Sequence, residues 1–266
     1  MNTDEKEISS NKFGHAHPVT ILINRISKIF TNMGFDIAEG PEMEKEWFNF
    51  DALNVPKNHP SRDMQDTFFL KLEEDEKSGK SVLRTHTSSV QVRYMQEFSK
   101  AVKRGEKNFP LAICVPGKVF RNEATDATHE AQFFQVEGLL IGENISVANL
   151  KATLEKFFSD FFEKDIKVQL RSSFFPFVEP GLEVAMQCFK CTGHGEECNI
   201  CKRSGLIEIM GAGMVHPKVL ENCGIDSRKY SGFAFGGGID RLAMLKYNIN
   251  DIRFLYNGDL RVVNQF

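Results

Sequence analysis

The sequence predicts an α+β fold in which a β-sheet packs against amphipathic helices. Residues 117–142 indicate two strands joined by a loop, because polar and apolar side chains alternate there as the two faces of a strand require. Residues 18–33 and 147–161 carry apolar side chains at helical spacing. If the apolar face of the sheet meets these helices, the polar face is left as the floor of a binding site.

Composition narrows the class of protein. The 266 residues suffice for one large domain or two small ones. With 33 basic and 36 acidic residues, the chain lacks the overall positive charge of a dedicated nucleic-acid binder, so RNA would bind locally or through a partner. No leader peptide opens the chain, and no apolar run approaches the roughly 20 residues that span a bilayer. We expect a cytoplasmic protein without membrane contact.

The first elements are a loose arm and a helix. Residues 1–16 are polar and are predicted to form a flexible N-terminal arm, leaving 17–266 as the folded domain. Pro18 suits the first turn of a helix, and Gly34 suits its end. The apolar stripe between them indicates core packing.

Residues 83–88 are predicted to be extended and to lead into a helix. This geometry places Arg84, His86 and Ser88 on one face. The alternative for His86 is a core histidine satisfied by the backbone.

The central pair of strands carries the polar floor. Arg121 and Glu123 share one face of the first strand, and the loop over residues 123–132 carries His129. One face of the second strand is shared by Phe133, Gln135 and Glu137. The alternative is an ordinary hairpin with one solvated face.

Ser146 is predicted to cap the helix over residues 147–161. Beyond this helix, residues 168–179 are predicted to form one strand. Such a strand places Phe175, Phe177 and Glu179 on one face. Two aromatic rings suit an aromatic ligand, and ordinary core packing is the alternative.

Four of the six cysteines form a C-x2-C, six residues, C-x2-C pattern. Two such pairs converge four thiolates tetrahedrally on zinc. We expect Cys188, Cys191, Cys198 and Cys201 to hold a structural zinc ion in a knuckle insertion over residues 187–204. Reduced surface cysteines are the alternative.

Glycines 236–238 precede a helix predicted to begin near Ile239. Arg241 falls in its first turn, where the helix dipole disfavours a cation. We therefore expect Arg241 to serve an anion or an aromatic ring.

Several blocks of sequence resemble one family. F-R-N-E, T-D-A-T-H-E and F-F-Q-V-E-G, in that order, resemble motif 2 of class II aminoacyl-tRNA synthetases; the segment around Pro41 is similar to motif 1 and GFAFGGGIDR to motif 3. R-T-H-T-S and F-P-F-V-E-P resemble blocks of the alpha subunit of bacterial phenylalanyl-tRNA synthetase. The resemblance covers residues 14–266. It departs at Gln65, where a tryptophan is usual, at Gly237, and in the cysteine loop, which many members lack.

The resemblance implies a catalytic core with an antiparallel sheet flanked by helices. It implies activation of L-phenylalanine by ATP with Mg²⁺, transfer to tRNA-Phe, and a beta subunit in an α2β2 heterotetramer. The heptad arm that usually grips tRNA in the family does not precede His15.

The same resemblance implies roles for site residues. Arg121, His129 and Arg241 are the implied catalytic residues. Arg121 meets the α-phosphate, His129 the β- and γ-phosphates, Phe133 and Arg241 enclose adenine, and Glu123 approaches its amino group. Glu179 is the candidate magnesium ligand. The implied ligands of the amino and carboxylate groups of phenylalanine are His86, Ser88, Gln135 and Glu137. The implied contacts of its ring are Phe175, Phe177 and Ala234.

Two other functions stay open. In the first, the chain would be a shortened synthetase paralogue that binds an amino acid or a partner protein. In the second, it would aminoacylate another acceptor. Intact Arg121, His129 and Arg241 favour catalysis. No Walker loop, Rossmann fingerprint or serine elbow competes in the sequence.

Overall fold

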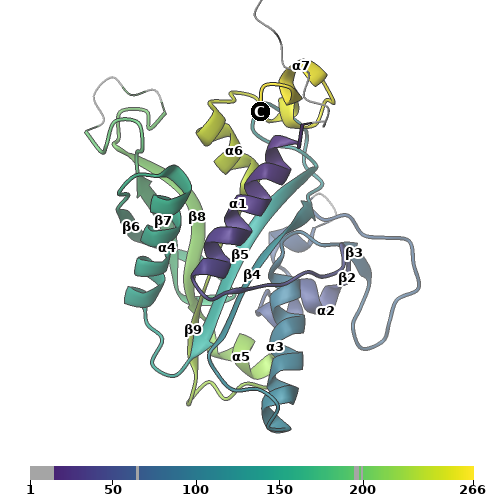
Figure 1. Cartoon of the computed structure of the whole chain (residues 1–266). Coiled ribbons are helices and arrows are strands. Elements are labelled where there is room, and N and C mark those ends of the chain that lie inside the picture. The colour runs from purple at the N-terminus through teal and green to yellow at the C-terminus, as the bar shows by residue number, and fades with distance from the viewer. Residues whose placement is uncertain (1–14, 64–65, 195–197, 199) are drawn as a thin grey trace, which may run out of the picture.

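A seven-stranded sheet forms the centre of the protein, in a computed structural model that describes residues 15–63, 66–194, 198 and 200–266 (Figure 1). Most of the predicted arm at 1–16, and Gln65, lie outside these residues. The strand order is β1 (Asp36–Ile37), β4 (Leu111–Phe120), β5 (Gln132–Gly142), β9 (Ser231–Gly238), β8 (Leu206–Val215), β7 (Val178–Gln187) and β6 (Val168–Phe175).

The predicted antiparallel sheet flanked by helices is confirmed, with one addition. All neighbours from β4 to β6 are antiparallel, whereas the two-residue edge strand β1 runs parallel to β4. A separate small sheet pairs β2 (Met43–Lys45) with β3 (Ser81–Leu83).

Helices cover both faces of the large sheet. On one face lie α1 (Pro18–Asn32), α4 (Val147–Phe162) and α6 (Ile239–Tyr247). The other face carries α2 (Glu46–Asn49), the 3-10 turn η1 (Asp51–Leu53), α3 (Ser88–Lys103) and α5 (Pro217–Asn222). The chain is completed by η2 (Pro60–Arg62), η3 (Ile252–Leu255) and α7 (Leu260–Val263).

Local sequence sets the helix ends. His17 accepts a hydrogen bond from the backbone N–H of Val19 at the start of α1, and the chain leaves this helix through Gly34 at φ +88°. Ser146 and Asn149 form a capping box at the start of α4. The predicted helix starts at Pro18 and Ile239 and the predicted cap at Ser146 are confirmed.

The two faces of β5 explain where a site can form. Val136 is buried in the core under α1 and α4, while Leu139 and Ile141 are buried in the core under α3. Gln135 and Glu137 alternate with Val136, so their side chains lie on the α3 side.

The single strand predicted over 168–179 is wrong. Phe175 ends β6, residues 176–177 turn, and β7 begins at Val178, which pairs with Phe175. Pro176 has no N–H for a sheet ladder, which favours the turn. Directly paired residues point to the same side, so Glu179 points to the side opposite Phe175 and Val178. Within the described part of the chain, no helix is both long and apolar enough to cross a membrane.

Candidate active site

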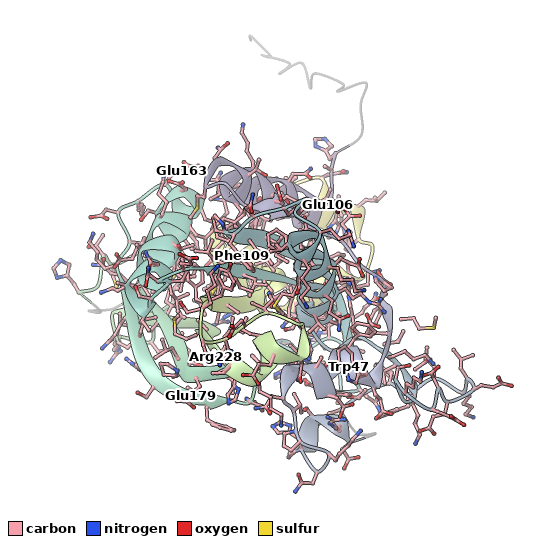
Figure 2. The ribbon with its side chains drawn as sticks, turned by 90° about the horizontal axis from the view of Figure 1, so that it is seen from below. Trp47, Glu106, Phe109, Glu163, Glu179 and Arg228 are labelled. Atoms are coloured by element: carbon pink, nitrogen blue, oxygen red, sulfur yellow. The ribbon has the colours of Figure 1, made fainter. Side chains whose placement is uncertain are left out.

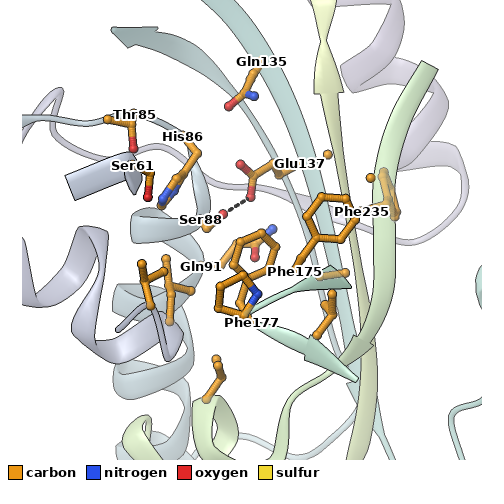
Figure 3. Close-up of a pocket in the computed structure, with 18 of the residues that line it drawn as sticks. Ser61, Thr85, His86, Ser88, Gln91, Gln135, Glu137, Phe175, Phe177 and Phe235 are labelled. Atoms are coloured by element: carbon orange, nitrogen blue, oxygen red, sulfur yellow. Dashed lines mark hydrogen bonds between the residues drawn. The ribbon is translucent and has the colours of Figure 1, made fainter. Parts of the chain in front are cut away.

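A cavity of about 580 Å³ lies on the α3 side of the sheet (Figure 3). Its wall comes from segments distant in sequence: η1, α3, β5, the turn between β6 and β7, and β9. This volume suits a small-molecule ligand. Nine of the predicted site residues line it, namely His86, Ser88, Arg121, Glu123, Gln135, Glu137, Phe175, Phe177 and Ala234.

A buried carboxylate marks the polar end of the cavity. Glu137 accepts a hydrogen bond from the backbone N–H of Thr87 at 3.0 Å. It also accepts one from the hydroxyl of Ser88 at 2.6 Å (Figure 3). Both donors belong to the start of α3, where the helix dipole favours negative charge. Burial raises the pKa of Glu137, and these hydrogen bonds oppose that rise. The Ser88 hydroxyl thus orients Glu137, and a cationic ligand group would compensate the carboxylate.

Three buried polar atoms at the cavity have no hydrogen-bond partner among the described residues. They are Nδ1 of His86, Nε2 of Gln91 and Oε1 of Gln135. A buried polar atom left unpaired costs free energy, so these atoms point to a polar ligand. Burial, aided by the charge of Arg121, lowers the pKa of His86 to about 4. The imidazole is therefore neutral at neutral pH.

Gln91 was missed by sequence reasoning. It lies three residues after Ser88 on α3, and residues at this spacing share a helix face. That spacing was the available signal.

The neighbouring Arg84 instead has a structural role, because its guanidinium donates to the carbonyls of Lys118 and Gly40 at 2.7 and 3.0 Å.

Two aromatic rings close the apolar end. The centroids of Phe175 and Phe177 lie 6.0 Å apart with an angle of 21° between the ring planes. Phe175 ends β6 and Phe177 belongs to the turn, so the hairpin brings together rings that the predicted strand would also have placed on one face. Ala234 on β9, paired with Leu139 of β5, also lines this cavity.

Glycines of β9 make room for protein side chains. A Cβ at Gly236 would lie 2.6 Å from Cγ of Glu137, so this glycine admits the buried carboxylate. At Gly237 a Cβ would lie 2.9 Å from Cβ of Met210, so Met210 leaves no room for a larger side chain at this position.

A second cluster surrounds the end of β4. The guanidinium carbon of Arg121 lies 5.0 Å from the ring centroid of Phe133, and its Nη1 lies 3.9 Å from Oε1 of Glu123. The Arg121 side chain is 42% exposed. It can therefore reach a ligand that enters from solvent.

His129 is exposed on the loop between β4 and β5 and does not line the cavity. Its Nδ1 lies 3.0 Å from Oδ2 of Asp126, whose Oδ1 accepts from the backbone N–H of His129 at 2.8 Å. This contact, with those of Thr128, holds the pKa of Asp126 well below its usual range. Asp126 thereby fixes the orientation of the imidazole.

Arg241 lies in the first turn of α6, as expected, and is exposed outside the cavity. The preceding Asp240 is buried and accepts hydrogen bonds from the N–H of Phe134 and the hydroxyl of Tyr256. Arg241 therefore directly follows Asp240 in the sequence, and Phe133 directly precedes Phe134, the residue that donates to Asp240.

Glu179 is exposed, does not line the cavity, and lies at the periphery of the molecule (Figure 2). Its role as a magnesium ligand stays a prediction. Among the described residues, Glu179 belongs to no group of three or more His, Cys, Asp or Glu side chains that could hold a metal ion.

Four thiols converge in the connection between β7 and β8. The sulfurs of Cys188, Cys191, Cys198 and Cys201 all lie within 4.8 Å of one another. Two pairs, Cys188 with Cys198 and Cys191 with Cys201, are 3.7 Å apart. A tetrahedron with metal–sulfur bonds of about 2.3 Å has edges of about 3.8 Å. The four thiols therefore fit one metal ion.

The sheet topology and the cavity agree with one class of protein. Residues 3–266 match the model of the family described as tRNA synthetases class II core domain (F). The chain therefore belongs to the class II tRNA synthetases.

Its curated relatives narrow the family. The chain is 52% identical over 255 residues to the phenylalanine–tRNA ligase alpha subunit of Lysinibacillus sphaericus. The matched region covers 96% of this chain and 69% of the relative. It is 53% identical to the subunit of that name from Anoxybacillus flavithermus, over 95% of this chain and 69% of the relative. The Staphylococcus carnosus subunit is 51% identical, over 97% and 68%. Within class II, the chain is a member of the phenylalanine–tRNA ligase alpha subunit family.

Proposed function

We propose that this chain activates L-phenylalanine with ATP and transfers it to tRNA-Phe. One observation carries the proposal: the cavity joins a buried carboxylate and unpaired polar atoms at one end to two aromatic rings at the other. An amino acid with a phenyl side chain has this distribution of charge and apolar surface. The sequence similarity to relatives named phenylalanine–tRNA ligase alpha subunits supports the proposal.

The amino-acid head would bind at the polar end. Glu137 would accept from the ammonium group, with its carboxylate oriented by Ser88 and Thr87. Gln135 offers an acceptor, Gln91 a donor, and neutral His86 a ring nitrogen. Each would gain the hydrogen bond that it lacks in the described structure.

The phenyl ring would lie against Phe175 and Phe177, with Ala234 as the wall behind it. Edge or offset contacts with two rings add about 0.5–1.5 kcal/mol each beyond burial. None of these three side chains offers a hydrogen-bond partner to a phenol hydroxyl. This arrangement favours phenylalanine over tyrosine.

ATP would bind between the motif 2 loop and α6. In the first step, a carboxylate oxygen of phenylalanine forms a bond to the α-phosphorus and pyrophosphate leaves. Arg121 would stabilise the charge on the α-phosphate in the transition state. His129 would meet the outer phosphates, Phe133 and Arg241 would enclose adenine, and Glu123 would approach the adenine amino group.

Metal ions have separate roles. Magnesium bound with ATP would neutralise part of the negative charge of the phosphates. Glu179 stays the candidate protein ligand for this magnesium ion. The four cysteines fit zinc, the usual occupant of a tetrahedral site with four sulfurs. With four protein ligands no coordination position is left open for substrate, so zinc would stabilise the 187–204 insertion.

We infer a beta subunit partner, since the relatives are named alpha subunits. An α2β2 heterotetramer in the cytoplasm is the assembly that we propose. The alternative, a module that binds an amino acid or a partner protein, predicts no catalysis.

Charging of tRNA tests this function directly. The chain, alone and with the beta subunit, is incubated with ATP, labelled phenylalanine and tRNA-Phe. We expect pyrophosphate exchange and charged tRNA-Phe with the complex. Exchange without charging of tRNA-Phe would indicate another acceptor, and binding of phenylalanine without exchange would indicate the non-catalytic module.

A further inference from the structure

The segment after α6 contacts three other parts of the molecule, and two of them, the loop that carries His129 and the start of α6, belong to the proposed ATP site. The N–H of Ile252 donates to the carbonyl of Ala127 in the loop that carries His129, at 2.9 Å. Nε2 of His17, before α1, lies 2.9 Å from the carbonyl oxygen of Leu255. The hydroxyl of Tyr256 donates to Oδ1 of Asp240 at the start of α6.

Asp240 joins this segment to β5. Its residue is 2% exposed, and Oδ2 accepts from the N–H of Phe134 at 2.6 Å. Burial raises the pKa of Asp240, and the bonds from Tyr256 and Phe134 oppose the rise. A buried carboxylate keeps its place only when both oxygens are satisfied. Tyr256 therefore supports a contact that fixes the start of α6 against the start of β5.

The neighbours of these two bonded residues matter. Phe133 precedes Phe134, and Arg241 follows Asp240. The Phe134–Asp240 bond, which rests in turn on Tyr256, therefore helps to set the distance between the two side chains that would enclose adenine, together with the pairing of Gln135 with Gly238.

We propose that Tyr256 is a positioning residue for the ATP site. It fixes the spacing of Phe133 and Arg241 through Asp240, and the adjoining Ile252–Ala127 bond anchors the loop that carries His129. The inference rests on the proposed function, because the adenine site belongs to it. Tyr256 itself does not line the cavity, and its hydroxyl donates to Asp240.

The amino-acid end of the site is held by other contacts. Glu137 lies three residues along β5 from Phe134 and is fixed by Thr87, which precedes α3, and by Ser88, its first residue. Three residues of strand span about 10 Å. Loss of the Tyr256 hydroxyl should therefore affect ATP and leave phenylalanine binding unchanged.

The test compares Tyr256→Phe with Tyr247→Phe in the complex with the beta subunit. Tyr247 lies on α6, its ring packs on Phe266 with centroids 4.6 Å apart, and its hydroxyl has no hydrogen bond among the described residues. Phenylalanine-dependent pyrophosphate exchange gives KM for ATP, KM for phenylalanine and kcat. Amide hydrogen exchange of the peptide 132–142 reports on the Phe134 N–H without any need for activity.

We expect Tyr256→Phe to raise KM for ATP by about 3- to 10-fold, as the loss of one hydrogen bond would. KM for phenylalanine should stay within about twofold. Exchange of the Phe134 amide should accelerate, and Tyr247→Phe should match the wild type in every measurement.

Two results would overturn the inference while the proposed function stands: an unchanged KM for ATP in Tyr256→Phe, or an equal rise in both KM values. A wild type without exchange or ATP binding would overturn the proposed function and this role together. Faster Phe134 exchange in that case would show that the Tyr256–Asp240–Phe134 linkage exists without serving ATP.

Discussion

Glu137 illustrates how single residues make the site. Its carboxylate lies in the protein interior, held by the start of α3, and burial raises its pKa. A buried anion is costly unless it is paired. Sequence alternation correctly predicted Gln135 and Glu137 on one face, yet it could not predict that Ser88 pairs with Glu137, because that contact joins residues 49 positions apart.

At this scale, replacing Arg121 by alanine should lower the rate of pyrophosphate exchange by about a hundred- to a thousandfold, because a donor to transition-state charge is lost. The fold should survive, since the side chain is 42% exposed. Arg228→Ala is the matched control: that side chain is 90% exposed and pairs with Asp226 (Figure 2). Near wild-type exchange in purified Arg121→Ala would contradict the role of Arg121.

His86 should make stability depend on pH. Its pKa falls from 6.5 in the unfolded chain to about 4 in the folded protein because the imidazole is buried. Between these values the unfolded chain binds a proton that the folded protein does not. The stabilisation is therefore present above about pH 6.5 and is lost as pH falls toward about 4.

From pH 7.5 to 5 the linkage amounts to about 2 kcal/mol of unfolding free energy. Urea unfolding of the wild type and of His86→Asn at both pH values measures it. The variant should lose less stability on acidification by about that amount. Equal losses in the two proteins would show that His86 titrates normally.

Elements were predicted with uneven success. The helix starts at Pro18 and Ile239 and the cap at Ser146 followed from capping residues and apolar spacing, which are local signals. The break of 168–179 into two strands was missed, although Pro176 lies at the turn. Alternation continues across such a short turn, so the pattern alone does not reveal a reversal of direction. The correction leaves Phe175 and Phe177 at the cavity and places Glu179 outside it.

The cysteine knuckle is the element that a metal should stabilise. We expect about one zinc per chain after dialysis, and a lower melting temperature after chelation, because four thiolates that close on zinc contribute folding energy. Cys198→Ser should lose zinc, whereas Cys223→Ser, a buried cysteine outside the cluster, should retain it. A dialysed protein without metal and equally stable would return these thiols to ordinary reduced cysteines.

In the whole molecule the seven-stranded sheet lies between two hydrophobic cores, and the cavity proposed to bind the amino acid lies on its α3 face. The end of β4, the start of β5, the start of α6 and the segment after α6 meet at the proposed ATP site. The order of motifs in the sequence predicted most of the residues that line the cavity and that we propose to bind the amino acid. Gln91 and Tyr256 did not, because their importance depends on distant partners and on burial, which local patterns do not encode.

The specificity of pyrophosphate exchange tests the central claim most directly. Exchange is measured with phenylalanine, tyrosine and para-chlorophenylalanine in the wild type and in Ala234→Gly. Apolar pockets reject an added hydroxyl by about a hundredfold, and a close wall adds to this. The account predicts phenylalanine-dependent exchange in the wild type, with tyrosine and the chloro compound gaining in Ala234→Gly at little loss for phenylalanine. No phenylalanine-dependent exchange, or the same ratios in both proteins, would contradict the proposed cavity as the phenylalanine site.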